Sequence, residues 1–306
     1  MNFELSKSFP TFIRTSTYFS QLMPAKKRTS HGRAFSQRSP DTTWKSNKTA
    51  LITGASNGLG YDLASVFAEN GYNIVLVARN REKLLALANQ ARQMFGVSAC
   101  VVSKDLVRPE TPAEIFKELQ TRGINVDILV NNAGYGLLGP FGYSDSEDQL
   151  NMLAVNVMAP VRLTTLFLPG MLAKGRGRIL NIASTAGFQP GPFMTGYYAS
   201  KTFIVNFSVG LAEELKNRGV TVSVLCPGPM ATGFRSRAGI RQPAFLASLA
   251  DIDSRVVARN GFEGLMAGKV IVVPGILNKL GIMAGRVFPM TIIARILGTV
   301  QKQRMP

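Results

Sequence analysis

Three side chains in the second half of the chain have the types and the spacing that proton transfer requires. Ser184 precedes Tyr197 by thirteen residues, and Lys201 follows Tyr197 by four. Residues four apart share one face of a helix, so a helix here brings the Tyr197 phenol beside the Lys201 ammonium. A free phenol has a pKa near ~10, and a nearby ammonium is expected to lower it. Tyr198 is also a helical neighbour of Lys201, and a Tyr–Lys pair of this kind also occurs as simple packing.

The scarcity of histidine excludes several other kinds of chemistry. The single histidine, His31, lies in a poorly patterned leader. A Ser-His-Asp hydrolase, a zinc site with imidazole ligands and a dehydrogenase with a histidine base each need a histidine in the folded body. The two cysteines, Cys100 and Cys226, fall in predicted strands and are expected to be buried thiols. Acid–base chemistry is therefore expected from Tyr, Lys, Asp, Glu or Cys.

A glycine-rich loop follows the first predicted strand and opens a helix. It reads Thr53-Gly54-Ala55-Ser56-Asn57-Gly58-Leu59-Gly60. Glycines let the backbone approach an anion closely, and a helix N-terminus offers unpaired N–H groups and the positive end of the helix dipole. The loop is therefore predicted to bind the pyrophosphate of a dinucleotide. Its spacing differs from the G-x-G-x-x-G form, and a glycine turn at a strand end is also a common structural feature.

The residue after the second predicted strand bears on the choice of dinucleotide. Folds that prefer NAD place an acid there to bind the ribose hydroxyls. This chain has Arg79 instead, and a guanidinium can bind a 2′-phosphate through two hydrogen bonds. NADP(H) is therefore the predicted cofactor, and NAD is less favoured. A solvated loop arginine is the alternative interpretation.

Strands and helices alternate from Thr49 onward. The apolar patterns predict strands at 49–53, 73–78, 99–103, 126–131, 178–182, 221–226 and 269–273. They predict helices up to Asn70 and at 81–95, 111–122, 146–168, 197–217, 254–267 and 289–300. This alternation predicts an α/β, doubly wound Rossmann fold with a seven-stranded parallel sheet. Residues 49–275 are expected to form the single catalytic domain, and 276–306 a C-terminal helical extension.

The charge of the chain is uneven. Residues 1–48 hold nine Lys/Arg and two acids, out of a net charge of +17. This leader lacks periodicity and an apolar signal region, so it is expected to be a disordered tail, with an organelle-targeting segment as the alternative. A cytoplasmic location follows from the first interpretation. No basic run is interleaved with aromatic residues, so nucleic acid is not an expected partner.

The last part of the chain is apolar but interrupted by charge. Lys279, Arg286 and Arg295 divide the stretch 276–298, so it is not predicted to span a bilayer. The helix at 289–300 is expected to pack on the domain or on a subunit partner in a homo-oligomer. Peripheral contact with a membrane is the alternative.

With these motifs in view, the chain resembles the classical short-chain dehydrogenase/reductase family from about Lys48 to Gly275. After the glycine loop, the matching elements follow in the family's order and spacing: Asp105-Leu106, Asn131-Asn132-Ala133-Gly134, Asn156, Ser184, Tyr197-x-x-x-Lys201, Pro227-Gly228 and Thr232. The resemblance implies hydride transfer between a nicotinamide cofactor and a carbonyl or alcohol.

The resemblance also implies roles for individual residues. Tyr197, rather than Tyr198, would exchange a proton with the carbonyl oxygen, and Ser184 would hydrogen-bond that oxygen. Lys201 would hold the nicotinamide ribose, and Asn156 would position a water that links Lys201 to solvent. The residues expected to contact the cofactor are Thr53, Gly54, Ser56, Asn57, Gly58, Leu59, Gly60, Arg79, Asp105, Leu106, Asn132, Ala133, Gly134, Tyr197, Lys201, Pro227, Gly228 and Thr232. No metal ligand is predicted.

Apolar residues in two segments suggest the substrate. Phe188 and Met194 lie in one segment, and Leu137 and Phe141 in the other. If both border the site, the pocket suits an acyl, lipid-like or steroid-like ketone, although loop packing explains these residues as well. Residues 229–252 are expected to form a substrate lid. The predicted function is an NADP-dependent carbonyl reductase or alcohol dehydrogenase; the alternative is a non-catalytic NADP-binding regulator or scaffold on the same fold.

Overall fold

Continuous apolar runs form a parallel sheet at the centre of the computed structural model, which describes residues 48–230 and 252–305. Runs of this kind suit strands whose two faces are both covered by helices. The seven strands are β1 (Thr49–Thr53), β2 (Asn73–Ala78), β3 (Ala99–Ser103), β4 (Ile128–Asn131), β5 (Gly177–Ile182), β6 (Val220–Leu225) and β7 (Ile271–Val272). All adjacent pairs are parallel.

The strand order creates a crevice at one edge of the sheet. The order is β3-β2-β1-β4-β5-β6-β7, so the chain runs outward from β1 to β3 and then returns to place β4 on the other side of β1. Loops that leave β1 and β4 therefore diverge in opposite directions. In open α/β sheets, ligands bind outside the carboxyl ends of the strands at such a point. The predicted doubly wound fold is confirmed.

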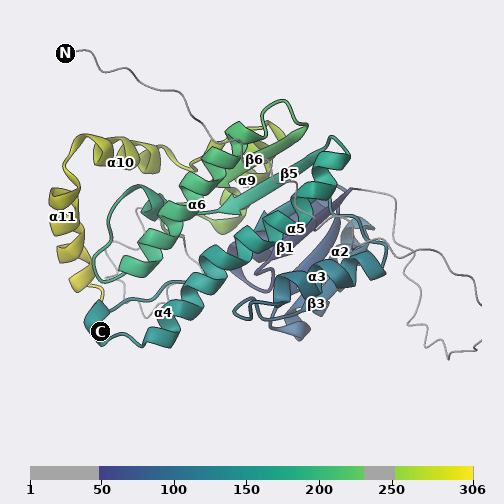
Figure 1. The fold of residues 1–306 in the computed structure, drawn as a ribbon, viewed down its shortest axis with the longest axis horizontal. Coiled ribbons are helices and arrows are strands. Elements are labelled where there is room, and N and C mark those ends of the chain that lie inside the picture. Colours follow the sequence, from purple (N-terminus) through teal and green to yellow (C-terminus); the bar gives the residue numbers. More distant parts are fainter. Residues whose placement is uncertain (1–47, 231–251, 306) are drawn as a thin grey trace, which may run out of the picture. The chain divides into compact units, whose positions relative to one another are not determined.

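Helices cover both faces of the sheet (Figure 1). Ala50 and Ile52 face a core that includes α1, α2 and α9, whereas Leu51 faces a core that includes α3, α5 and α6. This alternation follows from the two-residue period of a strand. The bounds are α1 (Gly58–Glu69), α2 (Arg81–Phe95), α3 (Thr111–Thr121), α4 (Ser146–Leu153), α5 (Ala159–Ala173), α6 (Thr195–Glu214) and α9 (Ser254–Met266).

One predicted helix has an irregular centre. The sequence pattern predicts a single helix over 146–168, whereas the structure has α4, a π-helical turn at Ala154–Met158 and then α5, which ends at Ala173. By length and composition alone the run could cross a membrane, since it contains an 18-residue window with a mean hydropathy of 1.4. Leu163, Phe167 and Met171 are nevertheless buried against the sheet, so in this fold the run serves as a core helix.

Two helices follow β7. They are α10 (Ile276–Val287) and α11 (Met290–Lys302), drawn in yellow at the edge of Figure 1. The predicted helix at 289–300 corresponds to α11, whereas α10 was anticipated only as part of a helical extension. Gly298 of α11 lies close to the segment before α6, because a Cβ built on it would be 3.6 Å from Pro192. The last helix therefore reaches back toward the site.

Candidate active site

A cavity of about 720 Å³ lies at the carboxyl edge of the sheet. The glycine loop, the end of β2 and the loop after β3 border one part of it, and the first turn of α6 borders another. Leu297, Val300 and Gln301 of α11 complete the wall. A single cavity thus joins the predicted dinucleotide loop to the predicted proton-transfer residues.

Side chains from β1 and β4 fix the glycine loop in place. Asn132 donates through Nδ2 to the Thr53 carbonyl at 2.8 Å, while Thr53 Oγ1 accepts from the backbone N–H of Asn132 at 2.9 Å. A Cβ on Gly60 would lie 2.3 Å from the Gly54 carbonyl oxygen and 2.4 Å from Asn132 Nδ2. Gly60 therefore permits the loop, the helix and β4 to meet. Thr53 lies inside this junction and is not among the residues that border the cavity, so its predicted contact with the cofactor stays a prediction.

The N-terminus of α1 is open toward the cavity. Asn57 has the extended backbone of an N-cap residue, but its side chain makes no capping bond. Its Oδ1 instead accepts a hydrogen bond from Lys83 Nζ at 2.9 Å. Gly58, Leu59 and Gly60 border the cavity. Unpaired N–H groups at a helix N-terminus attract anions, so these residues fit a pyrophosphate.

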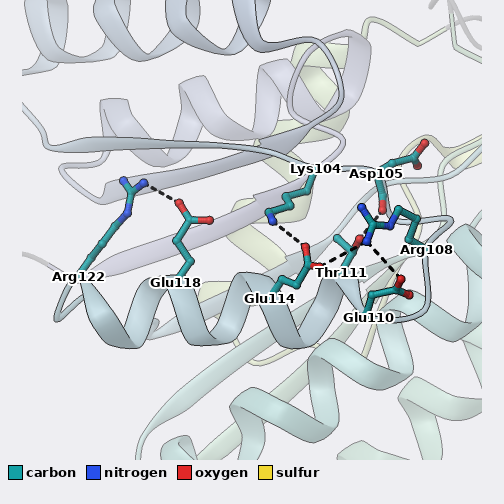
Figure 2. A network of polar contacts seen from close by, with 8 residues as sticks. All are labelled: Lys104, Asp105, Arg108, Glu110, Thr111, Glu114, Glu118 and Arg122. Atoms are coloured by element: carbon teal, nitrogen blue, oxygen red, sulfur yellow. Dashed lines mark hydrogen bonds and ion pairs between the residues drawn. The ribbon is translucent and has the colours of Figure 1, made fainter.

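Arg79 is the cation best placed for a further phosphate. Its side chain is 72% exposed, and its Nη1 lies 3.9 Å from Asp105 Oδ2. Lys104 also borders the cavity, but its ammonium contacts Glu114 at 2.6 Å, and this hydrogen bond lowers the pKa of the Glu114 carboxyl. Figure 2 shows this pair together with Thr111, which donates to the Asp105 carbonyl at 2.6 Å. The loop that carries Asp105 is thus tied to α3.

Ser184 and Tyr197 meet across the cavity wall. Ser184 follows β5, accepts from the Ala186 N–H at 3.1 Å and donates to the Pro227 carbonyl at 3.3 Å. Tyr197, on the first turn of α6, is 9% exposed. Burial raises the pKa of its phenol above the ordinary value, and a hydrogen bond with Ser184 partly opposes that rise. Tyr198 is the neighbouring phenol, and its ring centroid lies 6.0 Å from that of Tyr197.

Lys201 is buried beneath Tyr197. Its ammonium donates to the Ile182 carbonyl at 2.9 Å and lies 5.8 Å from the centre of the Tyr197 ring. Burial lowers the pKa of Lys201 to about 8. The expectation that this ammonium lowers the pKa of Tyr197 is wrong for this arrangement, because loss of hydration dominates at both groups. At neutral pH the phenol is therefore protonated and suited to donate a proton.

Asn156 lies behind the cavity wall, inside the π-helical turn. Its Nδ2 donates to the Tyr135 carbonyl at 2.9 Å and to Ser200 Oγ at 3.0 Å, and its Oδ1 accepts from the Tyr135 N–H at 3.0 Å. Short π-helical segments are often found at functional sites. A Cβ on Gly134 would be 3.0 Å from Asn156 Oδ1 and 3.3 Å from Lys201 Nζ. Asn156 thus clamps the segment after β4 to α6, next to Lys201.

Most of the residues expected to contact the cofactor border this cavity. Thr53 and Ser56 do not, and Thr232 lies outside the described residues, as does most of the expected lid. Sequence reasoning missed Lys104, Tyr135 and Gln301, which also border it, and none of them belongs to a spaced motif. Among the described residues, no group of three His, Cys, Asp or Glu side chains is arranged to hold a metal ion.

Comparison with known proteins identifies the family of this chain. The sequence model of the family described as short chain dehydrogenase matches residues 48–242. The very-long-chain 3-oxoacyl-CoA reductase of Aspergillus terreus is 31% identical over 291 residues, which cover 89% of this chain and 81% of that protein. The enzyme of the same name from Anas platyrhynchos is 35% identical over 202 residues, 64% of this chain. That match spans only 63% of the length of the duck protein.

Solved structures agree with these matches. A short-chain dehydrogenase from Sphingobium yanoikuyae in complex with NADPH has a TM-score of 0.71 and 31% identity over 78% of this chain and 93% of its own. A short-chain dehydrogenase/reductase from Burkholderia phymatum in complex with NAD has a TM-score of 0.69 and 27% identity, covering 78% of this chain and 92% of its own. The chain belongs to the short-chain dehydrogenase family.

Proposed function

We propose that this protein reduces a 3-oxoacyl thioester to the 3-hydroxyacyl product with NADPH, using Tyr197 as the general acid. The observation that carries the proposal is the meeting of Ser184, Tyr197 and Lys201 at a cavity that also contains the glycine loop. Leu137, Met194, Leu297 and Val300 supply apolar wall. The names of the relatives from Aspergillus terreus and Anas platyrhynchos support an acyl substrate.

The side chains suit reduction. A reduced nicotinamide cofactor, which the glycine loop and Arg79 would hold, would supply the hydride for the 3-carbonyl carbon. Tyr197 gives its proton to the carbonyl oxygen, so that a C–H and an O–H bond replace the C=O π bond. Ser184 hydrogen-bonds that oxygen, and the Lys201 ammonium offsets the charge left on the phenolate. Asn156 holds the Gly134 backbone next to the Lys201 side chain. Because burial raises the pKa of Tyr197, the acid is present at neutral pH.

The preference for NADPH rests on Arg79. The acid that would bind the ribose hydroxyls of NAD is absent after β2, and the guanidinium there borders the cavity. Its only ion pair among the described residues is the long one with Asp105, at 3.9 Å. Arg79 can therefore reach a 2′-phosphate without first breaking a close contact.

The outer face of α10 and α11 suits an anionic membrane surface. Ile276, Leu277, Leu280, Met283 and Val287 form an exposed apolar row along α10. Residues 264–306 contain six Lys/Arg and no Asp or Glu. An exposed apolar helix face with basic flanks is typical of segments that lie in a membrane interface. Peripheral attachment would place the cavity beside the source of an acyl substrate; a homo-oligomeric interface is the competing use of this face.

Two variants test the proposed chemistry. NADPH oxidation is followed with 3-oxoacyl thioesters, aldehydes and simple ketones. Tyr197→Phe should lower kcat for the thioester by at least about 100-fold, the lower limit of a general-acid contribution, while NADPH binding stays close to that of the wild type. Tyr143→Phe is the matched control, since Tyr143 is 92% exposed. Full turnover by Tyr197→Phe would refute the assignment, and NADPH binding without any turnover would favour the regulator or scaffold.

A further inference from the structure

One acceptor in the cavity wall has no donor among the described residues. Gln301, in the last turn of α11, is 2% exposed. Its Nε2 donates to Tyr198 Oη at 3.1 Å and contacts Met194 Sδ at 3.7 Å. Within the described part of the chain, its Oε1 finds no hydrogen-bond partner. Buried polar side-chain atoms are rarely left in this state, so the exception calls for an explanation.

The surroundings of Gln301 point to a ligand rather than to an unused core atom. Gln301 borders the cavity together with Tyr198 and Arg304. The adjacent Tyr197 ring lies 6.0 Å from that of Tyr198, so the amide is near the proton donor. Arg304 lies close enough to lower the pKa of Tyr198, although burial raises it more. The wall from α11 therefore holds a buried amide with a spare acceptor, and a cation, close to Tyr198.

The chemistry of a 3-oxoacyl thioester limits which part of it can meet Gln301. Its two carbonyl groups are acceptors and its acyl chain is apolar, so neither offers a donor. The pantetheine arm beyond the sulfur carries amide N–H groups, and the far end of a coenzyme A carrier is polyanionic. We propose that Gln301 Oε1 accepts a hydrogen bond from the first amide N–H of this arm, with Arg304 attracting the anionic end. This inference rests on the proposed function.

A matched pair of short substrates isolates the proposed bond. One is a 3-oxoacyl N-acetylcysteamine thioester, and the other replaces the single amide N–H by an ester oxygen. The wild type should prefer the amide by about tenfold in kcat/KM, since a site built for a donor rejects the analogue that lacks it. Gln301→Leu should reduce this preference to near unity. Gln301→Glu keeps the acceptor and should retain it.

Controls separate binding from damage to the fold. Gln303→Leu changes an exposed residue of the same helical end and should keep the wild-type preference. The ester analogue reports the general activity of each variant, because it cannot make the bond. Equal rates for both thioesters in the wild type, or an unchanged preference in Gln301→Leu, would overturn this inference alone. Reduction of simple ketones but of neither thioester would overturn the proposed function and this inference with it.

Discussion

Replacing Arg79 by Ala should change the cofactor preference without destroying cofactor binding. The guanidinium is 72% exposed and 3.9 Å from the Asp105 carboxylate. A hydrogen bond to a charged group contributes about 1.5–3 kcal/mol. Solvent screening and competition from Asp105 place the bond to a 2′-phosphate at the lower end, about 1.5 kcal/mol, which corresponds to a roughly tenfold rise in the Kd for NADPH. The Kd for NADH should stay nearly constant, because NADH lacks that phosphate.

Fluorescence titration of both dinucleotides measures the two constants directly. Arg81→Ala is the matched control, because it removes the same charge two positions further on. Arg81 is exposed and does not border the cavity. The NADPH effect of Arg79→Ala should shrink at high salt, as expected for an exposed ion pair. Equal losses for NADPH and NADH, or the same loss in Arg81→Ala, would remove the case for direct phosphate recognition.

Three further predictions follow from the geometry. Gly60→Ala places a methyl group 2.3 Å from the Gly54 carbonyl oxygen; it should cost about 1–3 kcal/mol in thermal unfolding and weaken NADPH binding. Gly210→Ala, with no neighbouring atom within 4 Å, should instead be neutral or stabilising, and the opposite order would show that the Gly54 carbonyl does not restrict residue 60. The pKa of Lys201 is lowered to about 8, so its side chain is charged below that pH and neutral above it. The kcat/KM for reduction should therefore fall as the pH rises through about 8. Tyr197 stays protonated across this range because its pKa is raised, and a pH-independent rate would refute the need for the Lys201 charge. Leu277→Glu, at a side chain that is 68% exposed on α10, should reduce co-sedimentation with anionic liposomes. Val256→Glu is the control, because Val256 is 49% exposed on α9, and it should leave liposome binding unchanged. If Leu277→Glu abolishes a dimer instead of liposome binding, this face serves self-association.

The sequence was sufficient for the parts of the fold that local pattern determines. The predicted bounds of β1, β2, β3 and α2 match the structure, because each is a clear apolar run or an amphipathic repeat between turn residues. The last predicted strand, 269–273, is reduced to Ile271–Val272. It lies at the sheet edge and pairs only with β6, so pairing, rather than the apolar run, sets its length.

The site was predictable in composition but not in electrostatics. Sequence spacing placed Tyr197 and Lys201 together, yet it could not show that both are almost fully buried, and burial reverses the expected shift of the Tyr197 pKa. The π-helical turn around Asn156 was equally hidden, since its residues continue a helical pattern. Gln301 was missed because its position depends on how α11 returns to Met194 and Tyr198, which no local pattern records.

Because α11 returns to the cavity, two separate regions of the polypeptide form its wall. The groups proposed to handle the proton and the dinucleotide come from the carboxyl edge of the sheet and the start of α6, whereas Leu297, Val300 and Gln301 come from the final helix. Substitutions in the tail can therefore reshape what is admitted while the reactive geometry stays intact. Exchanging α11 among homologous scaffolds would then offer a route to new substrate ranges with the turnover machinery left untouched.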